Sequence, residues 1–262
     1  MTAREKEELM KNTILSAKGL CKSFAHNGGQ LHILSHIDLE LYKGDFTVIM
    51  GASGSGKSTL LYALSGMDRA TAGQIIYDGR DIVTMKEKDL AKLRHTDFGF
   101  IFQQMHLVSN LSLFENIVVP GYLNKSKTAS EVKTRAEKLL DQMGILKVGS
   151  HLPSQVSGGE QQRCAIARAV INTPALLFAD EPTGALNRKN TTEVLNLLTE
   201  LNSLGQSILM VTHDTRAALR ATRLLYLVDG KIMGDLELAP YRTEEEKSRE
   251  TQVNAWLSSM EW

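Results

Sequence analysis

The sequence has few cysteines, no excess of charge of either sign and no long apolar run. Its 262 residues include only Cys21 and Cys164, too few for a disulfide framework, which indicates a reducing compartment. The 30 basic and 30 acidic residues balance, so no nucleic-acid partner is expected. No apolar stretch approaches the roughly 18 residues of a membrane span, and the charged residues 1–11 do not resemble a secretory signal. These absences predict a soluble intracellular protein without its own membrane anchor.

The sequence does contain short apolar runs separated by turns and amphipathic stretches. We expect strands at 14–24 and 31–42, joined by the turn Asn27-Gly28-Gly29, and strand-like character over 75–83. Further apolar runs typical of buried strands are 46–50, 98–102, 176–179 and 208–211. Helices are expected from Leu60 onward, over 130–143 with Gly144 as the stop, and over 190–203. A strand, a crossover helix and a second strand predict a parallel sheet.

The tail, residues 241–262, contains both tryptophans, Trp256 and Trp262. The residues that would share one face of a helix are Val253, Trp256, Leu257 and Met260. This stripe favours a terminal helix docked on its own domain. A tail that binds a partner is the alternative.

The segment 51–58 reads G-A-S-G-S-G-K-S and fits the phosphate-loop pattern G-x-x-x-x-G-K-[ST]. Its glycines allow consecutive N–H groups to point at phosphate oxygens, and the following helix adds its positive end. Lys57 is expected to hold the β- and γ-phosphates, Ser58 to ligate Mg²⁺ and Thr59 to help bind the α-phosphate. The expected nucleotide contacts are Gly51, Ser53, Gly54, Ser55, Gly56, Lys57, Ser58 and Thr59. We therefore predict binding of a nucleoside triphosphate.

A second chemical element is an apolar run that ends in Asp180 and Glu181. A carboxylate at the carboxyl end of a strand lies beside the crevice where open α/β sheets bind ligands. Asp180 is expected to hold Mg²⁺, and Glu181 to polarise a water in line with the γ-phosphate. Without the phosphate loop the same pair would be a weak signal, because many such pairs only cap the next turn.

Ser157-Gly158-Gly159-Glu160-Gln161 closely resembles the signature motif of ATP-binding-cassette (ABC) ATPases. Physically this is another glycine-fronted helix start, and therefore a second anion cradle that one ATP in the same chain does not need. The resemblance implies that Ser157, Gly158, Gly159 and Glu160 of one subunit cover the ATP held by the phosphate loop of another. It thus implies a head-to-tail homodimer around two ATP molecules.

Other positions match the same family one by one. Gln103 resembles the glutamine that senses Mg²⁺ and the attacking water, although Gln104 is adjacent and the assignment can shift by one. His213 resembles the histidine that contacts the γ-phosphate, and Phe24 stands where an aromatic stacks on adenine. Asn187 ends a segment, 184–187, that resembles the D-loop, where aspartate is usual. This departure weakens a cross-dimer contact or changes the hydrolysis rate.

The resemblance implies an α/β fold with a P-loop NTPase, RecA-like parallel-sheet core, an N-terminal antiparallel β subdomain and an inserted α-helical subdomain. The ATPase domain is expected over 14–238, with the helical insertion at about 104–172 and an acidic, helical tail at 239–262. ATP and Mg²⁺ are the implied cofactors. The expected catalytic residues are Glu181, His213, Lys57 and Gln103, and the expected metal ligands are Ser58, Gln103 and Asp180.

Spacing excludes several ABC relatives. Lys57 and Ser157 lie 100 residues apart, too close for a long coiled coil between them, and two cysteines cannot build a zinc module. Local segments at 49–59, 99–103 and 179–186 resemble the macrolide-exporter, lipoprotein-releasing and bacitracin-resistance subgroup. We favour the antimicrobial-peptide branch.

This resemblance implies an ATPase motor that docks on a separate integral-membrane permease at the cytoplasmic face of the membrane. Residues 104–123 are the expected permease groove, although Met105, Leu107 and Phe114 could equally be core. One alternative is a cell-division type ATPase that signals to a membrane partner. Another is a nucleotide-sensing regulator with little turnover.

Overall fold

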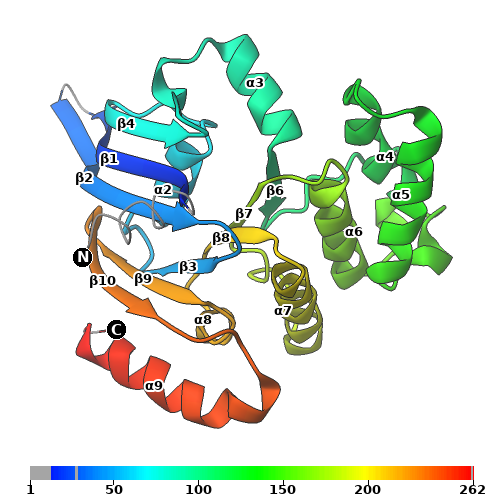
Figure 1. Ribbon diagram of the computed structural model, residues 1–262. Helices are drawn as coiled ribbons and strands as arrows, with labels where there is room; N and C mark the ends of the chain where they lie inside the picture. Colours follow the sequence, from blue (N-terminus) through cyan, green and yellow to red (C-terminus); the bar gives the residue numbers. More distant parts are fainter. Residues whose placement is uncertain (1–12, 27–28, 261) are drawn as a thin grey trace, which may run out of the picture.

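The computed structural model describes residues 13–26, 29–260 and 262, and Figure 1 shows how its elements are arranged. One sheet is antiparallel, in the order β2-β1-β4-β5. Its strands are β1 (Thr13–His26), β2 (Gly29–Tyr42), β4 (Ala72–Tyr77) and β5 (Arg80–Asp81). The strands expected at 14–24 and 31–42 are confirmed, whereas the expected turn residues Asn27 and Gly28 lie outside the described residues.

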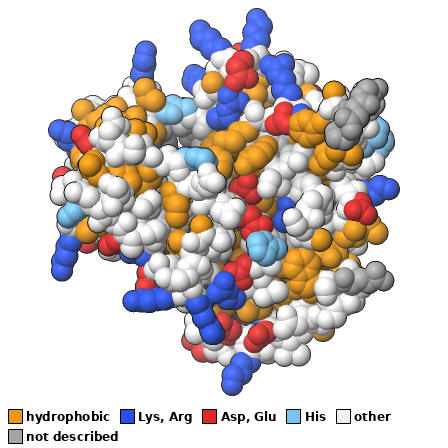
Figure 2. Space-filling model, turned by 180° about the vertical axis from the view of Figure 1, so that it is seen from behind, with side chains coloured by type: hydrophobic (Ala, Val, Ile, Leu, Met, Phe, Trp, Pro, Cys, Tyr) orange, Lys and Arg blue, Asp and Glu red, His pale blue; other side chains and the backbone are white. Residues whose placement is uncertain are grey.

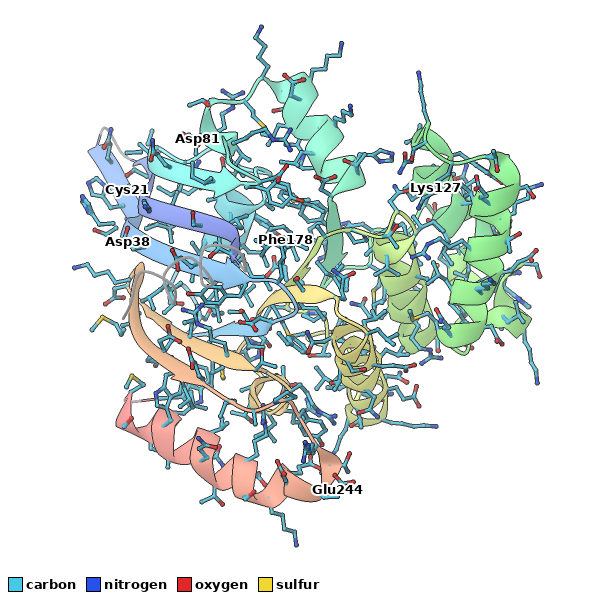
Figure 3. All side chains as sticks on the ribbon, viewed as in Figure 1. Cys21, Asp38, Asp81, Lys127, Phe178 and Glu244 are labelled. Atoms are coloured by element: carbon cyan, nitrogen blue, oxygen red, sulfur yellow. The ribbon has the colours of Figure 1, made fainter. Side chains whose placement is uncertain are left out.

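The strand expected over 75–83 is wrong at its far end. After the turn at Asp78-Gly79, pairing lasts only through β5, and a 3-10 turn (Ile82–Thr84) follows. The Asp81 side chain explains the change, because it accepts a hydrogen bond of 3.0 Å from the Val83 N–H and so caps that turn. Asp81 lies on the antiparallel sheet in Figure 3.

The second sheet has the order β10-β9-β3-β8-β7-β6, and every neighbouring pair is parallel except β9 with β10. Its strands are β3 (Phe46–Met50), β6 (Phe98–Phe102), β7 (Leu176–Asp180), β8 (Ser207–Val211), β9 (Arg223–Val228) and β10 (Lys231–Glu237). All residues of β3, β7 and β8 are buried, as expected for parallel strands covered on both faces. The predicted parallel sheet is confirmed.

Alternate residues of the central strands pack into two different apolar clusters. On β7, Leu177 and Ala179 face one cluster, whereas Leu176 and Phe178 face the other. The second of these clusters joins the two sheets and includes residues of helix α2 (Lys57–Leu64), and its member Phe178 is labelled in Figure 3. The sheet is thereby held between two cores, which fixes the loops at its carboxyl edge.

The remaining helices form the outer layers. They are α3 (Glu87–Thr96), α4 (Leu113–Leu123), α5 (Ala129–Gln142), α6 (Gly158–Val170), α7 (Arg188–Ser203), α8 (Thr215–Ala218) and α9 (Glu246–Ser259). Further 3-10 turns span Leu146–Val148, Pro153–Gln155 and Thr243–Glu245. In Figure 1 helices α4, α5 and α6 form an arm at the edge of the sheet next to β6. None of the described helices is both long enough and apolar enough to span a bilayer.

The tail helix α9 packs under β9 and β10, as Figure 1 shows. Val253 and Leu257 are buried in the core, and Trp256 and Met260 pack against it. The buried Arg249 guanidinium donates hydrogen bonds to backbone carbonyls, among them that of Leu219 at 2.6 Å. The docked terminal helix predicted from the apolar stripe is therefore what the structure shows.

Candidate nucleotide-binding site

A cavity of about 670 Å³ opens where β3, β7 and β8 end. Its lining residues are Ile33, Ala52, Ser53, Gly54, Gly56, Lys57, Ser58, Thr59, Gln103, Glu181, His213 and Trp262. Figure 2 shows acidic side chains and a histidine gathered near the middle of one face of the molecule. The carboxyl edge of a parallel sheet is the usual ligand site in open α/β folds, so the cavity is the candidate site.

The loop between β3 and α2 has a backbone that favours glycine at three positions, one of them Gly54 with φ +83°. A Cβ at Gly51 would lie 2.2 Å from the Leu227 carbonyl oxygen. Gly56 has φ +101° and lies against Ile33. Ser55 is buried, and its Oγ has no hydrogen-bond partner among the described residues. The loop therefore holds its tight curve with Ser53, Gly54 and Gly56 at the cavity, whereas the expected contacts Gly51 and Ser55 do not line it.

Lys57 is the first residue of α2, and its side chain reaches back across this loop. Its Nζ donates hydrogen bonds to the carbonyls of Gly51 at 2.8 Å and Ala52 at 2.9 Å. Burial lowers the pKa of the Lys57 ammonium, and the nearby carboxylates of Glu181 and Asp180 oppose that shift. The ammonium is thus already in the cavity wall, within a curved loop that suits a phosphate.

Asp180 ends β7 and its carboxylate is held by two hydroxyl groups of α2. The Ser58 hydroxyl donates to Oδ1 at 2.8 Å, and the Tyr62 hydroxyl donates to Oδ2 at 2.5 Å. Asp180 is 9% exposed, so this carboxylate sits at the base of the site rather than in open solvent. A hydroxyl and a carboxylate held this close supply hard oxygen ligands of the kind that Mg²⁺ prefers.

The donor set suits Mg²⁺ bound together with a nucleotide. The described residues contain no cluster of three or more His, Cys, Asp or Glu able to hold a metal ion by itself. Mg²⁺ commonly uses one or two protein ligands and completes its shell with substrate phosphates and water. Ser58 and Asp180 would hold the ion, whereas Gln103 lines the cavity from another element.

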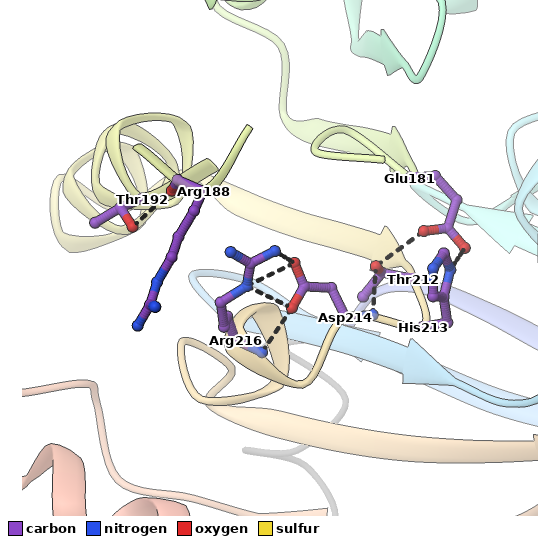
Figure 4. Close-up of polar contacts among 7 residues, drawn as sticks. All are labelled: Glu181, Arg188, Thr192, Thr212, His213, Asp214 and Arg216. Atoms are coloured by element: carbon purple, nitrogen blue, oxygen red, sulfur yellow. Dashed lines mark hydrogen bonds and ion pairs between the residues drawn. The ribbon is translucent and has the colours of Figure 1, made fainter. Parts of the chain in front are cut away.

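Glu181 follows Asp180 in a backbone conformation that is rare for glutamate, with φ +45°. Its N–H bonds the Val211 carbonyl at 2.9 Å, so the strained residue is fixed against β8. One carboxylate oxygen accepts from the Thr212 hydroxyl at 3.0 Å, and the other lies 2.9 Å from Nδ1 of His213 (Figure 4). Both oxygens of the Glu181 carboxylate are thereby held in fixed positions in the cavity wall.

Gln103 follows β6 and is exposed in the cavity wall. A Cβ on Gly184 would lie 2.9 Å from the Gln103 Nε2, so the Gln103 side chain lies against the 184–187 segment. Gln103 therefore connects the edge of the cavity to the loop before α7. Gln104, the other glutamine at this point of the sequence, does not line the cavity.

The glycine-rich start of α6 does not line this cavity. Ser157 caps α6 and forms a reciprocal capping box with Glu160, whose carboxylate accepts the Ser157 N–H at 2.8 Å and its hydroxyl at 2.7 Å. Gly158 is exposed, whereas Gly159 is buried so close to α7 that a Cβ would lie 2.5 Å from the Asn190 side chain. The chain thus keeps its second anion cradle apart from its own phosphate loop.

Two more expected contacts have other surroundings. Asn187 is the N-cap of α7, and its Oδ1 accepts the Asn190 N–H at 3.0 Å. Asparagine and aspartate are about equally good at this position, so the departure from aspartate keeps the helix start intact. Phe24 does not line the cavity; it is 43% exposed, with the Lys22 Nζ 4.6 Å from its ring centroid.

Sequence reasoning missed Ile33, which lines the cavity, and three further residues of the site. Thr212 and Tyr62 hold Glu181 and Asp180, and Trp262 lines the cavity while its ring meets that of Tyr226 edge-on at 5.9 Å. Helical spacing would have found Tyr62, because it lies four residues after Ser58 and shares its face. No sequence signal places Trp262 at the cavity, because that depends on how α9 docks.

Residues 34–184, more than half of the chain, match the family model described as "ABC transporter". The chain belongs to the ABC transporter family. Its expected P-loop NTPase fold is confirmed, and family membership makes it an ATP-binding ATPase domain. The ATP-binding cassette MJ0796, solved as a dimer in a post-hydrolysis state with ADP and phosphate, matches at a TM-score of 0.80 and 33% identity. That match covers 87% of this chain and all of the other.

Similar sequences in this family are named as macrolide exporters, which is the subgroup that local segments of this chain resemble. The macrolide export ATP-binding/permease protein MacB of Acinetobacter baylyi is 42% identical over 88% of this chain, and MacB of Pasteurella multocida is 37% identical over 97%. The chain spans only 35% and 38% of those two proteins. The shared part is the ATP-binding cassette, as the fold shows.

Proposed function

We propose that this ABC ATPase is the motor of an export system, and that it hydrolyses ATP in a head-to-tail dimer. The observation that carries the proposal is Glu181. Its carboxylate is oriented by Thr212 and His213 in the same cavity as Lys57 and the glycine-rich loop. A fixed carboxylate beside a phosphate-binding loop has the geometry of a general base for attack by water.

Each residue of the cavity has its own proposed role in hydrolysis. Lys57 and the loop N–H groups bind the β- and γ-phosphates and stabilise their charge, and Glu181 accepts a proton from water. The water oxygen bonds to the γ-phosphorus as the bond to the bridging oxygen breaks, which yields ADP and phosphate. His213 is held by Glu181 through Nδ1 and lines the cavity, where it is proposed to contact the γ-phosphate. Bound Mg²⁺, held by Ser58 and Asp180, would neutralise the developing phosphate charge.

The start of α6 supports the dimer in this proposal. Ser157 and Gly158 are exposed at a helix N-terminus that lies outside the chain's own nucleotide cavity. Such a terminus favours an anion, and a second copy turned head-to-tail would bring it to the γ-phosphate. The dimeric cassette with ADP and phosphate among the structural neighbours fits this arrangement.

A membrane permease is the proposed partner, with this chain at the cytoplasmic face of the membrane. The relatives named as macrolide export ATP-binding/permease proteins support export, whereas the antimicrobial-peptide branch stays a prediction. A hollow of about 340 Å³ beside β6 and α4 is lined partly by Phe102, His106 and Pro120 and is the proposed permease groove. Leu107 and Phe114 pack against the core, which leaves the groove to their neighbours.

The decisive experiment compares Glu181→Gln with Glu137→Gln, an exposed glutamate of α5. Loss of a general base slows a reaction roughly 100- to 10,000-fold. We expect Glu181→Gln to lose hydrolysis by at least about 100-fold, to keep ATP binding and to accumulate as an ATP-bound dimer in size-exclusion chromatography. Equal hydrolysis in both variants would remove Glu181 from the mechanism.

The same assay separates the motor from its alternatives. If the unmodified protein hydrolyses no ATP, alone or with its membrane partner, the motor proposal fails and a nucleotide sensor remains. Identification of the membrane protein that co-purifies with the chain tests export. A partner that regulates cell-wall hydrolases would favour the cell-division type instead.

A further inference from the structure

Tyr62 reaches the nucleotide site from the far side of the Asp180 carboxylate. Its hydroxyl donates to Oδ2 at 2.5 Å, while the Ser58 hydroxyl donates to Oδ1 at 2.8 Å. Tyr62 does not line the cavity, so it reaches the bound ligands only through Asp180. One carboxylate oxygen therefore faces the metal-binding hydroxyl, and the other is held from behind.

The position of Tyr62 is itself well fixed. Its ring packs against the apolar cluster that joins the two sheets. Its backbone carbonyl accepts the N–H groups of Met67 at 2.9 Å and Asp68 at 3.1 Å, where the chain leaves α2. A tyrosine anchored at both its ring and its backbone gives its hydroxyl a defined place.

A carboxylate held on one side only would be less well oriented. The terminal torsion of aspartate is broad, so a single hydrogen bond to Ser58 leaves rotation about the Cβ–Cγ bond open. The Ser58 hydroxyl can also bind a cation through a lone pair while its proton stays on Asp180. That arrangement requires Oδ1 to remain toward Ser58, which the bond from Tyr62 to Oδ2 enforces.

We infer that Tyr62 is a positioning residue that raises the affinity of the ATP site for Mg²⁺ by fixing the Asp180 carboxylate. The inference rests on the proposed Mg²⁺·ATP site. Groups that hydrogen-bond metal-binding side chains typically contribute about 10- to 100-fold to metal affinity or activity. Tyr62 is not a catalytic residue in this scheme, because it contacts neither the nucleotide nor the water.

The test is Tyr62→Phe, which removes one oxygen and keeps the packed ring. The affinity for a fluorescent, non-hydrolysable ATP analogue is measured in EDTA and across a Mg²⁺ titration. We expect the affinity in EDTA to stay the same and the Mg²⁺ concentration for half-maximal tightening to rise about 10-fold. Because no hydrolysis is measured, the readout is independent of Glu181.

The matched control is Tyr77→Phe, which breaks a similar tyrosine–aspartate bond, from Tyr77 to Asp97 at 3.1 Å, away from the cavity. It is expected to leave the Mg²⁺ dependence unchanged. Urea unfolding of both variants is measured alongside, so that a raised Mg²⁺ requirement in a Tyr62→Phe protein that unfolds like Tyr77→Phe is assigned to the missing hydroxyl.

Two results would overturn the inference, and they are distinguishable from failure of the proposed function. If Tyr62→Phe titrates with Mg²⁺ like the unmodified protein, Tyr62 has no positioning role, although the Glu181 result still stands. If Tyr77→Phe shows the same shift as Tyr62→Phe, the effect is general destabilisation. If the unmodified protein binds the analogue with no Mg²⁺ dependence, the proposed metal site itself is wrong.

Discussion

Both α2 and α6 have glycine at their starts, Gly56 just before α2 and Gly158 as the first residue of α6, yet the N–H groups of their first turns have different partners. Helix α2 follows Gly56 in a left-handed conformation, with no side-chain cap and no acidic residue in its first turn. Helix α6 begins with Ser157 as its cap and with Glu160 closing a capping box. The four N–H groups at a helix start need partners, and only α6 supplies one from its own side chains.

At α2, therefore, no side chain among the described residues satisfies the N–H groups of the first turn. At α6, Ser157 and Glu160 already do so in part. At α2 the first turn holds no acidic residue and no side chain caps it, and Gly56, Lys57 and Ser58 line the cavity. At α6 the carboxylate of Glu160 offsets part of the positive charge of the helix end, and Ser157 and Gly158 stay exposed to a partner. The chain is therefore expected to bind nucleotide through α2 alone, and to use α6 only when a second copy brings a nucleotide to it.

The largest expected effect is on ATP affinity and comes from a substitution at the start of α2. Lys57→Met removes the ammonium from the phosphate loop, and hydrogen bonds to charged groups are worth about 1.5–3 kcal/mol each. We expect ATP affinity, measured by equilibrium titration, to fall roughly 10- to 100-fold. Lys133→Met, at an exposed position of α5, is the control. Retained affinity in Lys57→Met would show that the phosphates bind elsewhere.

An intermediate effect comes from the α6 side. Ser157→Ala removes the N-cap, which typically lowers the free energy of unfolding by about 1 kcal/mol. ATP affinity of the single chain is expected to stay the same, because Ser157 does not line the cavity. Urea unfolding and ATP titration measure the two quantities, with the exposed Ser154→Ala as the control. A loss of ATP affinity in the monomer would contradict the separation of the two helix starts.

The smallest expected effect is the pH dependence of the same cap. Hydrogen bonds from the Ser157 side chain and backbone lower the pKa of Glu160 in the folded chain. A depressed carboxyl pKa stabilises the fold above the pKa of the unfolded chain, and this is lost as pH falls through the folded value. The stability difference between the unmodified protein and Ser157→Ala should therefore narrow from about pH 5 toward pH 3. Parallel urea stability curves over this range would argue against the capping bond.

Local patterns in the sequence predicted much of the fold. The apolar runs at 98–102, 176–179 and 208–211 became β6, β7 and β8, because a short, fully apolar run is stable only when both faces are covered. Helix α5 spans 129–142 where 130–143 was expected, since its apolar spacing is clear. The error at 82–83 came from one side chain, Asp81, whose bond to the Val83 N–H competes with strand pairing.

The sequence alone determined the phosphate loop, the Asp180–Glu181 pair and the family, because glycine conformations and charged residues at set spacings express their chemistry locally. Only the tertiary structure decided what orients those groups. Tyr62 meets Asp180 across 118 residues, and Thr212 and His213 meet Glu181 across 31 and 32. Those contacts exist because parallel strands from distant parts of the chain end at one edge of a sheet, and no local pattern encodes which side chains face one another there.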